Sequence, residues 1–585
     1  MTILKKLIPP LTAILSILLT ALLSILFVMQ HVNANPNTSN EKPNILWLVF
    51  EDMSPIISPY GDHTVSTPNI TQLAKEGVTY TNVYSTSGVC APSRAALALG
   101  MYPSAIGANH MRTTSNTNDT GLPKYFSVPP AQSKMLSQYM RESGYYTTNN
   151  YKEDYQLSAP KSAWHDSSKF AHWRNSPKSS PFYSVFNFTT THESGLFEPY
   201  GIRKIESRHY FSDNKGKISQ LPNQQMVKTQ GDHTPIHLPK TTSFNIPPYL
   251  PDTPVVRRDM WKMYNNLAEA DKQMGAIIAQ LKEDGLYDNT LIVFYADHGG
   301  PLPRQKRLIY DSGLKVPLII KYPKSKRAGK TDDRLISFVD FAPSTMAFAG
   351  IDIPKHMHGQ DFIVDKENKR DYVHAAADRF DGFTDVIRAV KDARFKYIRN
   401  YKPEQEYYLP VTYREKIPTM QELLRLKNEG KLDSIQMQWF RSSKPKEELF
   451  DTLQDPHELH NLATNPKYKS VLTRLRIAMD DWLTDINDTP LKPESELVKE
   501  LWNNQNQIPQ TAPVNFKLEG GLIYLESKTA GATISFRKMN EEMKHEWQLY
   551  REPIPHEPSA IIEAVAHRLG YAESKVQQLH FNDVM

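Results

Sequence analysis

The sequence predicts an α/β protein with a mostly parallel central sheet sandwiched by helices, a smaller α+β C-terminal subdomain and an appended β-rich module. Continuous apolar runs at residues 44–50 and 291–296 are typical of parallel strands that are buried on both faces. Helical patterns alternate with such runs along the chain, and this alternation builds a sheet covered by helices. Shorter apolar runs follow toward the C-terminus and predict smaller β-containing units there.

The first helix is expected at residues 67–77. Thr67 suits the N-cap, Pro68 suits the first turn, and Gly77 ends the pattern. The other elements expected in this part of the chain are helices over 131–142 and 257–282 and strands over 182–188 and 316–320.

The second half of the chain changes character. Short β-like runs at 385–397 and a helical pattern at 467–485 predict the α+β subdomain, and alternating runs at 522–525 and 532–536 predict the β-rich module. The boundaries that we expect are a signal peptide over 1–34, the main α/β domain over 43–360, its C-terminal subdomain over 361–489, a Pro-, Asn- and Gln-rich linker over 490–513 and a small β-sandwich-like module over 514–585.

The composition fits a folded chain that is not built for nucleic acid. Of the 585 residues, 39% are hydrophobic and 23% are charged, which excludes a disordered polyelectrolyte. The 69 basic and 64 acidic residues give a net charge of +5. This excess is too slight to indicate a nucleic-acid partner, although local basic patches can still hold anionic substrates.

The N-terminus resembles an export signal. Lys5 and Lys6 precede an uncharged run over 7–29, and small residues before Ala34 offer a cleavage site. The run is also long enough to span a bilayer, so an uncleaved signal-anchor is the alternative. Either way we expect an exported protein, periplasmic or secreted, that contacts a membrane only through this segment.

The chain has a single cysteine, Cys90, so no internal disulfide can form. A lone cysteine is usually a small buried hydrophobe. Its surroundings indicate another role, because Pro92, Ser93 and Arg94 follow at fixed spacing and a short helical run then ends at Gly100.

This segment resembles the C-x-P-S-R signature of the type I sulfatase family. The resemblance implies an alkaline phosphatase-like fold, a maturation enzyme as partner, and oxidation of Cys90 to 3-oxoalanine (formylglycine), the nucleophile. A hydrated aldehyde carries two hydroxyls on one carbon, of which one can attack sulfur while the other later expels sulfate by collapse to the aldehyde. Serine or unmodified cysteine lacks that exit route. The alternative is an inert buried thiol.

Acidic residues follow both buried runs. Because strands of one parallel sheet place ligands at their carboxyl ends, the acids that follow the two runs are expected to meet at one sheet edge. By the resemblance, the metal ligands are Glu51, Asp52, Cys90, Asp297 and His298. Family members often have Asp-Asp and Asp-Asn here, so Asp52 and Asp297 are the firmer expectations. Carboxylate ligands favour Ca²⁺, with Mg²⁺ as the second choice; acids that merely cap or face solvent are the alternative.

Three basic residues complete the expected site. The Arg94 guanidinium can bind the metal-ligand carboxylates. Lys306 opens a stretch, 306–317, that looks like the family segment whose first Lys contacts sulfate, and Lys152 matches the other sulfate-binding Lys. The family usually has a His two residues after this Lys, where the chain has Asp154, a candidate replacement. Solvated surface lysines are the alternative.

Histidines supply the remaining candidates. The resemblance places the leaving-group acid at His192, since imidazole can protonate a departing sugar oxygen near neutral pH; a structural histidine is the alternative. His110 and Arg112 lie just past the nucleophile helix, and either line the substrate pocket or form a turn.

The resemblance extends over about 43–485, and the sequence there most resembles bacterial polysaccharide sulfatases. The tail resembles a small β-sandwich of some hexosaminidases. We therefore expect a sulfuric ester hydrolase acting on a sulfated polysaccharide or oligosaccharide such as ulvan, carrageenan or a glycosaminoglycan. Two alternatives stay open: a phosphodiester or phosphonate ester hydrolase of the same superfamily, and a non-catalytic glycan-binding protein. The pattern fixes neither the sugar nor the oligomeric state.

Overall fold

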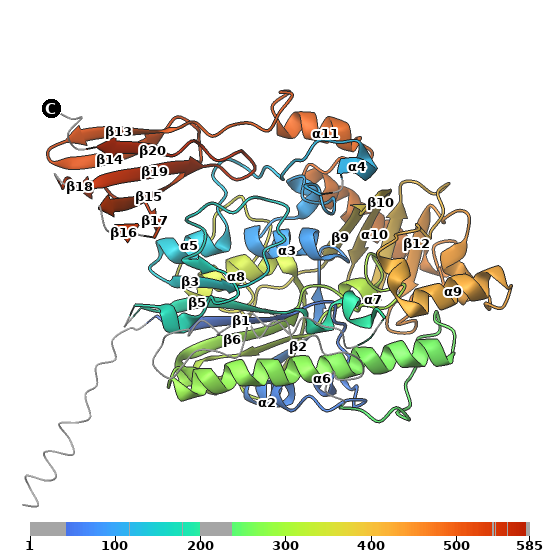
Figure 1. The fold of residues 1–585 in the computed structure, drawn as a ribbon. Coiled ribbons are helices and arrows are strands. Elements are labelled where there is room, and N and C mark those ends of the chain that lie inside the picture. The colour runs from blue at the N-terminus through green and yellow to red at the C-terminus, as the bar shows by residue number, and fades with distance from the viewer. Residues whose placement is uncertain are drawn as a thin grey trace, which may run out of the picture. The chain divides into compact units, whose positions relative to one another are not determined.

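A single large sheet organises the computed structural model, with helices on both faces (Figure 1). The structure describes residues 42–580 except 116, 178–179, 199, 201–236, 541–542, 545 and 558–559, so the predicted signal peptide lies outside the described residues. The strands, in spatial order, are β4 (Asp166–Ser167), β3 (Tyr146–Asn150), β5 (Phe182–Phe188), β1 (Asn44–Phe50), β6 (Thr290–Ala296), β7 (Leu318–Lys321), β2 (Val78–Tyr84) and β8 (Lys330–Ser337). β7 runs antiparallel to both neighbours and the other pairs are parallel, which confirms the predicted mostly parallel sheet.

Helices α2 (Pro68–Glu76) and α6 (Pro254–Glu283) cover one face of this sheet, and α3 (Cys90–Leu99), α5 (Leu136–Glu142) and α8 (Phe341–Phe348) cover the other (Figure 1). α5 begins later than the predicted residue 131. The Met135 backbone N–H donates to Gln138 Oε1 at 3.0 Å, and this local contact begins the helix. The other α-helices of the described residues are α4 (Thr117–Thr120), α7 (Asp311–Leu314), α9 (Pro418–Asn428), α10 (Lys469–Asp485) and α11 (Glu494–Leu501). None of the helices in the described part of the chain is long and apolar enough to span a bilayer.

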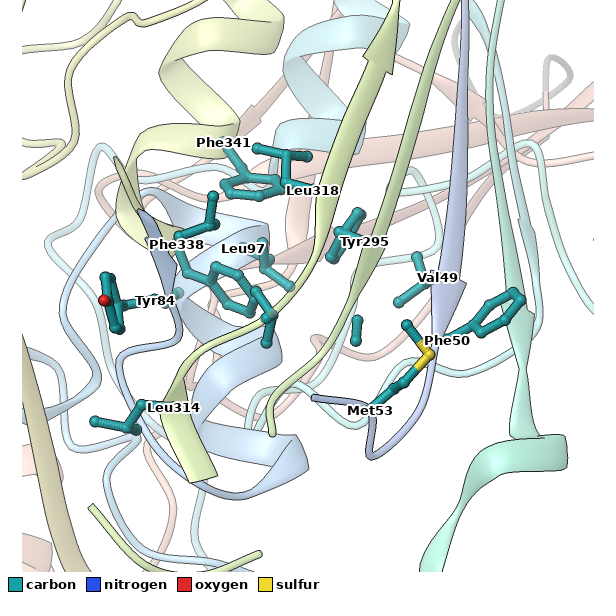
Figure 2. Packing of buried hydrophobic residues seen from close by; sticks show 14 of the residues in the cluster. Val49, Phe50, Met53, Tyr84, Leu97, Tyr295, Leu314, Leu318, Phe338 and Phe341 are labelled. Atoms are coloured by element: carbon teal, nitrogen blue, oxygen red, sulfur yellow. The ribbon is translucent and has the colours of Figure 1, made fainter. Parts of the chain in front are cut away.

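The main core lies between the sheet and the α3 and α8 layer. Every residue of β1 is buried, and the Trp47 ring meets the rings of Tyr183, Tyr295 and Phe341 edge-on at 5.5, 5.4 and 6.0 Å. Figure 2 shows Leu97 of α3 packed in the same layer with aromatic side chains that follow the strands. Removal of this apolar surface from water fixes α3, and so its first residue, against the strand ends.

A second sheet forms the C-terminal subdomain. Its antiparallel strands, in spatial order, are β12 (Glu447–Asp451), β11 (Phe395–Asn400), β10 (Phe383–Lys391) and β9 (Val373–Phe380). Asp381 and Gly382 form the two-residue turn between β9 and β10, and Asp381 has a φ of +56°. This left-handed conformation is typical of Asp-Gly hairpin turns.

The tail is β-rich, as predicted. One sheet contains β13 (Val514–Glu519), β14 (Leu522–Ser527) and β18 (Ile554–Pro555), and the other contains β15 (Thr533–Asn540), β16 (Met543–Lys544), β17 (Gln548–Leu549), β19 (Ile561–His567) and β20 (Gln577–His580). All pairs are antiparallel, and the two sheets enclose a core of their own that includes Ile523 and Ile562.

The tail packs on the main domain through close backbone contacts. A Cβ at Gly531 would lie 1.6 Å from Ala131 O, and a Cβ at Gly570 would lie 2.5 Å from Ser127 O. Both glycines have positive φ, so glycine is required at both positions for shape and for conformation. Arg141 Nη2 also donates to Trp547 O at 2.7 Å.

The segment predicted as a linker, 490–513, is not a simple solvated connection. It contains α11, whose Val498 packs with Trp502 and Tyr125 in a small core. Glu494 accepts hydrogen bonds from Arg379 Nε and Nη2 at 2.7 and 2.8 Å. The Pro, Asn and Gln content predicts a linker, but the segment contains a short amphipathic helix that buries one apolar face.

Candidate active site

The acids at the two strand ends meet because β1 and β6 are neighbouring parallel strands, with Phe50 opposite Ala296. The residues that follow each strand therefore leave the sheet at the same edge. The Asp52 backbone N–H donates to Asp297 Oδ1 at 3.1 Å. Asp52 has a φ of +48°, a left-handed conformation that turns the chain at the strand end and that Asp tolerates better than most residues. The structure thus brings together the acids of the two strand ends, which the sequence predicts to meet.

Cys90 lies in the first turn of α3 and is 2% exposed. Its Sγ is 3.3 Å from His298 Nε2 and 3.9 Å from Asp52 Oδ1. Ser93 Oγ donates to the Asp297 carbonyl oxygen and ties the helix to the end of β6. The positive end of the helix dipole therefore faces the acidic edge, where it favours anionic groups.

Arg94 holds the acidic edge in place from α3. Its Nε donates to Asp297 Oδ2 at 3.0 Å, and its Nη2 lies 3.6 Å from Glu51 Oε1. Its Nη1 donates to Asn187 Oδ1 at 2.7 Å. A planar guanidinium that contacts three groups at once fixes their relative positions, which is the role expected for Arg94.

Two lysines reach the same cluster from different loops. Lys306 Nζ donates to both carboxylate oxygens of Asp52, at 2.9 and 2.8 Å. Lys152 Nζ donates to Glu51 Oε1 and lies 3.7 Å from Asp154 Oδ2. The solvated-surface alternative does not describe these lysines, because Lys306 is 3% and Lys152 is 20% exposed.

The charges of the cluster shift the ionisation of its members. Burial raises the pKa of the Cys90 thiol, but Lys152 and Lys306 lower it more, and the net pKa is about 7. Burial lowers the pKa of His298, but Asp297, Cys90 and Asp52 together raise it more, to about 10. Asp297 in turn has a pKa of about 2, because His298 and Arg94 outweigh its burial. The site therefore stabilises negative charge at residue 90 and at the carboxylates.

The donor set fits a divalent cation. Ligand atoms of Cys90, Asp297 and His298 lie within 4.8 Å of one another, and so do those of Asp52, Cys90 and His192. Each group contains one strand-end carboxylate, and both carboxylates lie near His298 Nε2, at 3.0 Å for Asp52 Oδ1 and 3.7 Å for Asp297 Oδ1. Carboxylate oxygens are the ligands that a hard cation prefers. Glu51 lies beside Arg94 and Lys152, and the structure leaves its role as a ligand a prediction.

His192 faces the nucleophile from the loop after β5. Its Nδ1 lies 2.8 Å from Ser194 Oγ, and the Ser194 backbone N–H donates to the same nitrogen at 3.2 Å. These contacts hold one ring nitrogen and leave the other for substrate. The ring of Tyr413 lies 6.3 Å away, centroid to centroid.

The structure adds residues that the sequence pattern does not single out. Glu193 accepts hydrogen bonds from Arg307 Nη1 and Nη2 at 2.9 Å each, and its Oε1 lies 3.2 Å from Lys306 Nζ. Arg307 Nε donates to Asp381 Oδ2 at 2.9 Å, and Arg112 Nε lies 3.3 Å from Asp381 Oδ1. Glu193 directly follows His192, and Arg307 directly follows Lys306. This adjacency was the sequence signal that could have identified them.

The loop that carries Lys306 is held by an arginine on either side. Arg304 and Arg307 both have positive φ, of +63° and +73°. Arg304 donates to the carbonyl oxygens of His457 and Glu458 at 3.0 Å each. The guanidinium contacts at both ends hold a backbone shape that non-glycine residues rarely adopt, and so fix the lysine between them.

His110 is not brought to the cluster. Its Nδ1 accepts the Arg379 backbone N–H at 3.2 Å and lies 3.8 Å from Glu494 Oε2. Arg112, two residues on, faces Asp381 and the active-site side instead. The structure therefore separates two residues that were predicted together, because the His110 ring is bound to the α11 side.

The chain is similar over most of its length to known sulfatases. A model of the sulfatase family matches residues 43–351, and a model of the C-terminal region of N-sulphoglucosamine sulphohydrolase matches residues 304–442. An ulvan-active sulfatase of Formosa agariphila is 55% identical over 552 residues, which cover 93% of this chain and 92% of that protein. Human N-sulphoglucosamine sulphohydrolase is 22% identical over 480 residues, which cover 76% of this chain and 90% of that protein.

Solved structures show the same fold. A 2-O GAG sulfatase superposes with a TM-score of 0.52 at 20% identity over 77% of this chain and 93% of that chain. A protein solved in complex with D-glucosamine-2-N,6-O-disulfate superposes with a TM-score of 0.52 at 16% identity over 78% and 100%. The fold is therefore that of the alkaline phosphatase-like enzymes. The chain belongs to the sulfatase family, and its class of activity is the hydrolysis of sulfuric esters.

Proposed function

We propose that this sulfatase removes sulfate from a sulfated polysaccharide or oligosaccharide, with ulvan as the first candidate and carrageenan or a glycosaminoglycan next. The observation that carries the proposal is the buried cluster of Cys90, three acids and two lysines at one sheet edge. The 55% identical relative is named as ulvan-active, and two further relatives carry the same name at 27% and 24% identity.

Cys90, once oxidised to formylglycine by a maturation enzyme, is the proposed nucleophile; its hydrated aldehyde supplies the attacking hydroxyl. The residues around position 90 favour negative charge there, as the lowered pKa of the thiol shows. Lys152 and Lys306 both act electrostatically on residue 90. Their ammonium groups bind sulfate oxygens as charge develops during the reaction.

Asp52 and Asp297, with Cys90, Glu51 and His298, are the proposed ligands of a calcium ion, with magnesium as the second choice. When bound, the ion supplies positive charge that polarises the sulfate. Arg94 keeps the carboxylates in register for it through its contact with Asp297.

His192 is the proposed acid that protonates the departing sugar oxygen. Its Nδ1 is held by Ser194, so the opposite ring nitrogen faces the substrate. The residue that assists the nucleophile in place of the usual histidine is Asp154 in this proposal, since it lies beside Lys152.

The protein is also proposed to be exported to the periplasm or beyond the cell. Support comes from the basic and apolar N-terminal pattern, with cleavage near Ala34. A polysaccharide outside the cell is then within reach of the enzyme.

The test is the release of sulfate from ulvan, carrageenan and glycosaminoglycan oligosaccharides by the wild type and by Cys90→Ala. We expect the variant to lose at least about 10³-fold in kcat/KM while its unfolding midpoint changes little, because the group that attacks sulfur is removed. The mass of the wild-type peptide that contains residue 90 should be lower than that of its cysteine form.

Matched phosphate esters are assayed in parallel as the control for the phosphoester alternative. Faster turnover of the phosphate than of the sulfate ester would contradict the proposal. Binding of glycans without any turnover by the oxidised enzyme would support the glycan-binding alternative instead.

A further inference from the structure

A line of charged side chains connects the buried nucleophile to the surface. Lys306 is 3% exposed, Glu193 is 1% exposed and Arg307 is 3% exposed, whereas Asp381 is 16% and Arg112 is 42% exposed. Each member contacts the next, from Lys306 through Glu193, Arg307 and Asp381 to Arg112. The line therefore ends in a guanidinium at the rim of the site.

The cations of this line differ in how fully they are paired. Lys306 contacts Asp52 and Glu193, and Arg307 contacts Glu193 and Asp381, so each buried cation has two carboxylate partners. Arg112, at the exposed end, contacts only Asp381 among the described residues, and it shares this carboxylate with Arg307. Arg112 contacts Asp381 through Nε, and no contact of its two terminal nitrogens is found among the described residues.

The rim also offers a surface for a sugar ring. Tyr413 is partly exposed, and its ring packs on Phe197 at 5.2 Å and lies 6.3 Å from the ring of His192. Burial raises the pKa of Tyr413, and Glu193, Lys306 and Arg112 act on the same phenol electrostatically. Tyr413 therefore lies within the electrostatic reach of both the sulfate-binding lysine and Arg112.

We propose that Arg112 recognises a second anionic group of the substrate, a carboxylate or a further sulfate on the sugar that carries the scissile ester or on its neighbour. The inference rests on the proposed function, since His192 marks where the sugar oxygen leaves. The sugar that follows this oxygen lies against Tyr413, and its anionic substituent meets the terminal nitrogens of Arg112.

The Asp381 contact makes Arg112 a recognition group rather than a loose charge. It holds the guanidinium by Nε, and the end formed by the two terminal N–H₂ groups makes no contact among the described residues. A planar fork held in this way can bind a carboxylate or a sulfate through two parallel hydrogen bonds.

The experiment uses two pairs of sulfated disaccharides with one and the same scissile ester. In the first pair, one sugar contains a hexuronate carboxylate and the other contains the corresponding alcohol. In the second pair, one sugar has one more sulfate than the other. In the wild type the charged member of one pair should have a kcat/KM about 10- to 100-fold higher, the range of a charge-assisted hydrogen-bonded pair. The pair that shows the preference identifies which anion is recognised.

In Arg112→Ala this ratio should fall toward one, and Arg112→Lys should restore part of it. Arg474→Ala is the matched control, because Arg474 is 44% exposed and pairs with Asp392 at 2.5 Å at the opposite end of β10. A ratio that stays unchanged in Arg112→Ala, or a wild type without preference in either pair, would overturn the proposal.

Dissociation constants for the same four sugars are measured in the Cys90→Ala background, with and without Arg112→Ala. This arm needs no turnover, so loss of the anion preference in binding supports the role of Arg112 even if the proposed sugar is cleaved poorly. Release of sulfate from 4-nitrophenyl sulfate but from none of the sugars would instead count against the proposed function. Equal binding of both members of each pair would overturn the anion site itself.

Discussion

Two buried ionic clusters in this chain differ in how their carboxylates are balanced. At α7 and β11, Lys396 Nζ lies 2.6 Å from Asp311 Oδ1 and 2.8 Å from Glu458 Oε1, and it donates to the Ile309 carbonyl oxygen at 3.0 Å. This ammonium thus has three protein oxygens within 3.0 Å, and we call this cluster closed. It holds the loop after β6 against the C-terminal sheet and offers nothing to a ligand.

The active-site cluster has the opposite arrangement. Its carboxylates lie at the ends of neighbouring strands and face Cys90 and the lysines, which approach from separate loops. Here each cation pairs with a carboxylate, and a bound substrate or metal would take the place of one partner in the pair. Charge of both signs is equally buried in the two places, and the difference lies in whether the contacts are complete within the protein. Burial of charge therefore does not by itself indicate a catalytic site.

The largest effect should come from breaking the closed cluster. Lys396→Met removes the cation that contacts Glu458 and one of those that contact Asp311, so the free energy of unfolding should fall by about 3–5 kcal/mol. Urea unfolding monitored by fluorescence measures this loss.

Lys306→Met is the matched change in the active site. Asp52 keeps His298 and Glu193 keeps Arg307, so unfolding in the presence of calcium should change less than in Lys396→Met. Activity should fall by about 10²–10³-fold, the effect of one transition-state donor. Equal stability losses in the two variants would remove the distinction between the clusters.

The next largest difference between the two clusters should come from removal of the metal. Chelation with EGTA should abolish sulfate release, and calcium at 100 times its dissociation constant should restore it and stabilise the folded state by about 2.7 kcal/mol. Differential scanning calorimetry measures the stability change independently of activity. Magnesium at the same concentration should stabilise less. A chelated enzyme with an unchanged unfolding midpoint and full activity would contradict the proposed metal site.

The smallest effect concerns a buried histidine outside the site. His374 stacks on Trp482 at 4.7 Å, and burial together with Arg370 lowers its pKa to about 3. Below pH 6.5 the unfolded chain binds a proton that the folded chain does not, so stability present above this pH is lost as the pH falls toward 3. His374→Gln should reduce that slope by up to about 1.4 kcal/mol per pH unit.

The free energy of unfolding between pH 7 and pH 4 provides the measurement, and exposed His63→Gln serves as the control. An identical slope in wild type and His374→Gln would show that His374 is not neutral in the fold. His298, by contrast, has a raised pKa because Asp297 and Cys90 outweigh its burial. The two histidines thus repeat the difference between the regions.

The fold could be predicted where apolar runs are continuous. The strand runs at 44–50 and 182–188 match β1 and β5 because full burial on both faces leaves an unbroken apolar pattern. α11 was missed, since its apolar face is narrow and its surroundings are rich in Pro and Asn. The spacing of Glu494, Val498 and Trp502 contained the signal.

The site could be predicted where the chemistry is local in sequence. The Cys90 segment and the strand-end acids could be found because each depends on neighbouring residues. Glu193 and Asp381 could not, because their partner Arg307 is 114 and 74 residues away and long-range ion pairs leave no periodic pattern. His110 was grouped with Arg112 by adjacency, whereas a turn sends the two side chains to different partners.

The glycines that face Ala131 and Ser127 limit how this protein can be rearranged in evolution or by design. Gly531 and Gly570 bring backbone against backbone, so the tail cannot be exchanged for that of a relative unless both surfaces are exchanged with it. An enzyme shortened to residue 513 would expose the α5 side to solvent and leave Arg141 without its contact to Trp547. The tail is thus a structural part of the enzyme and not a detachable accessory.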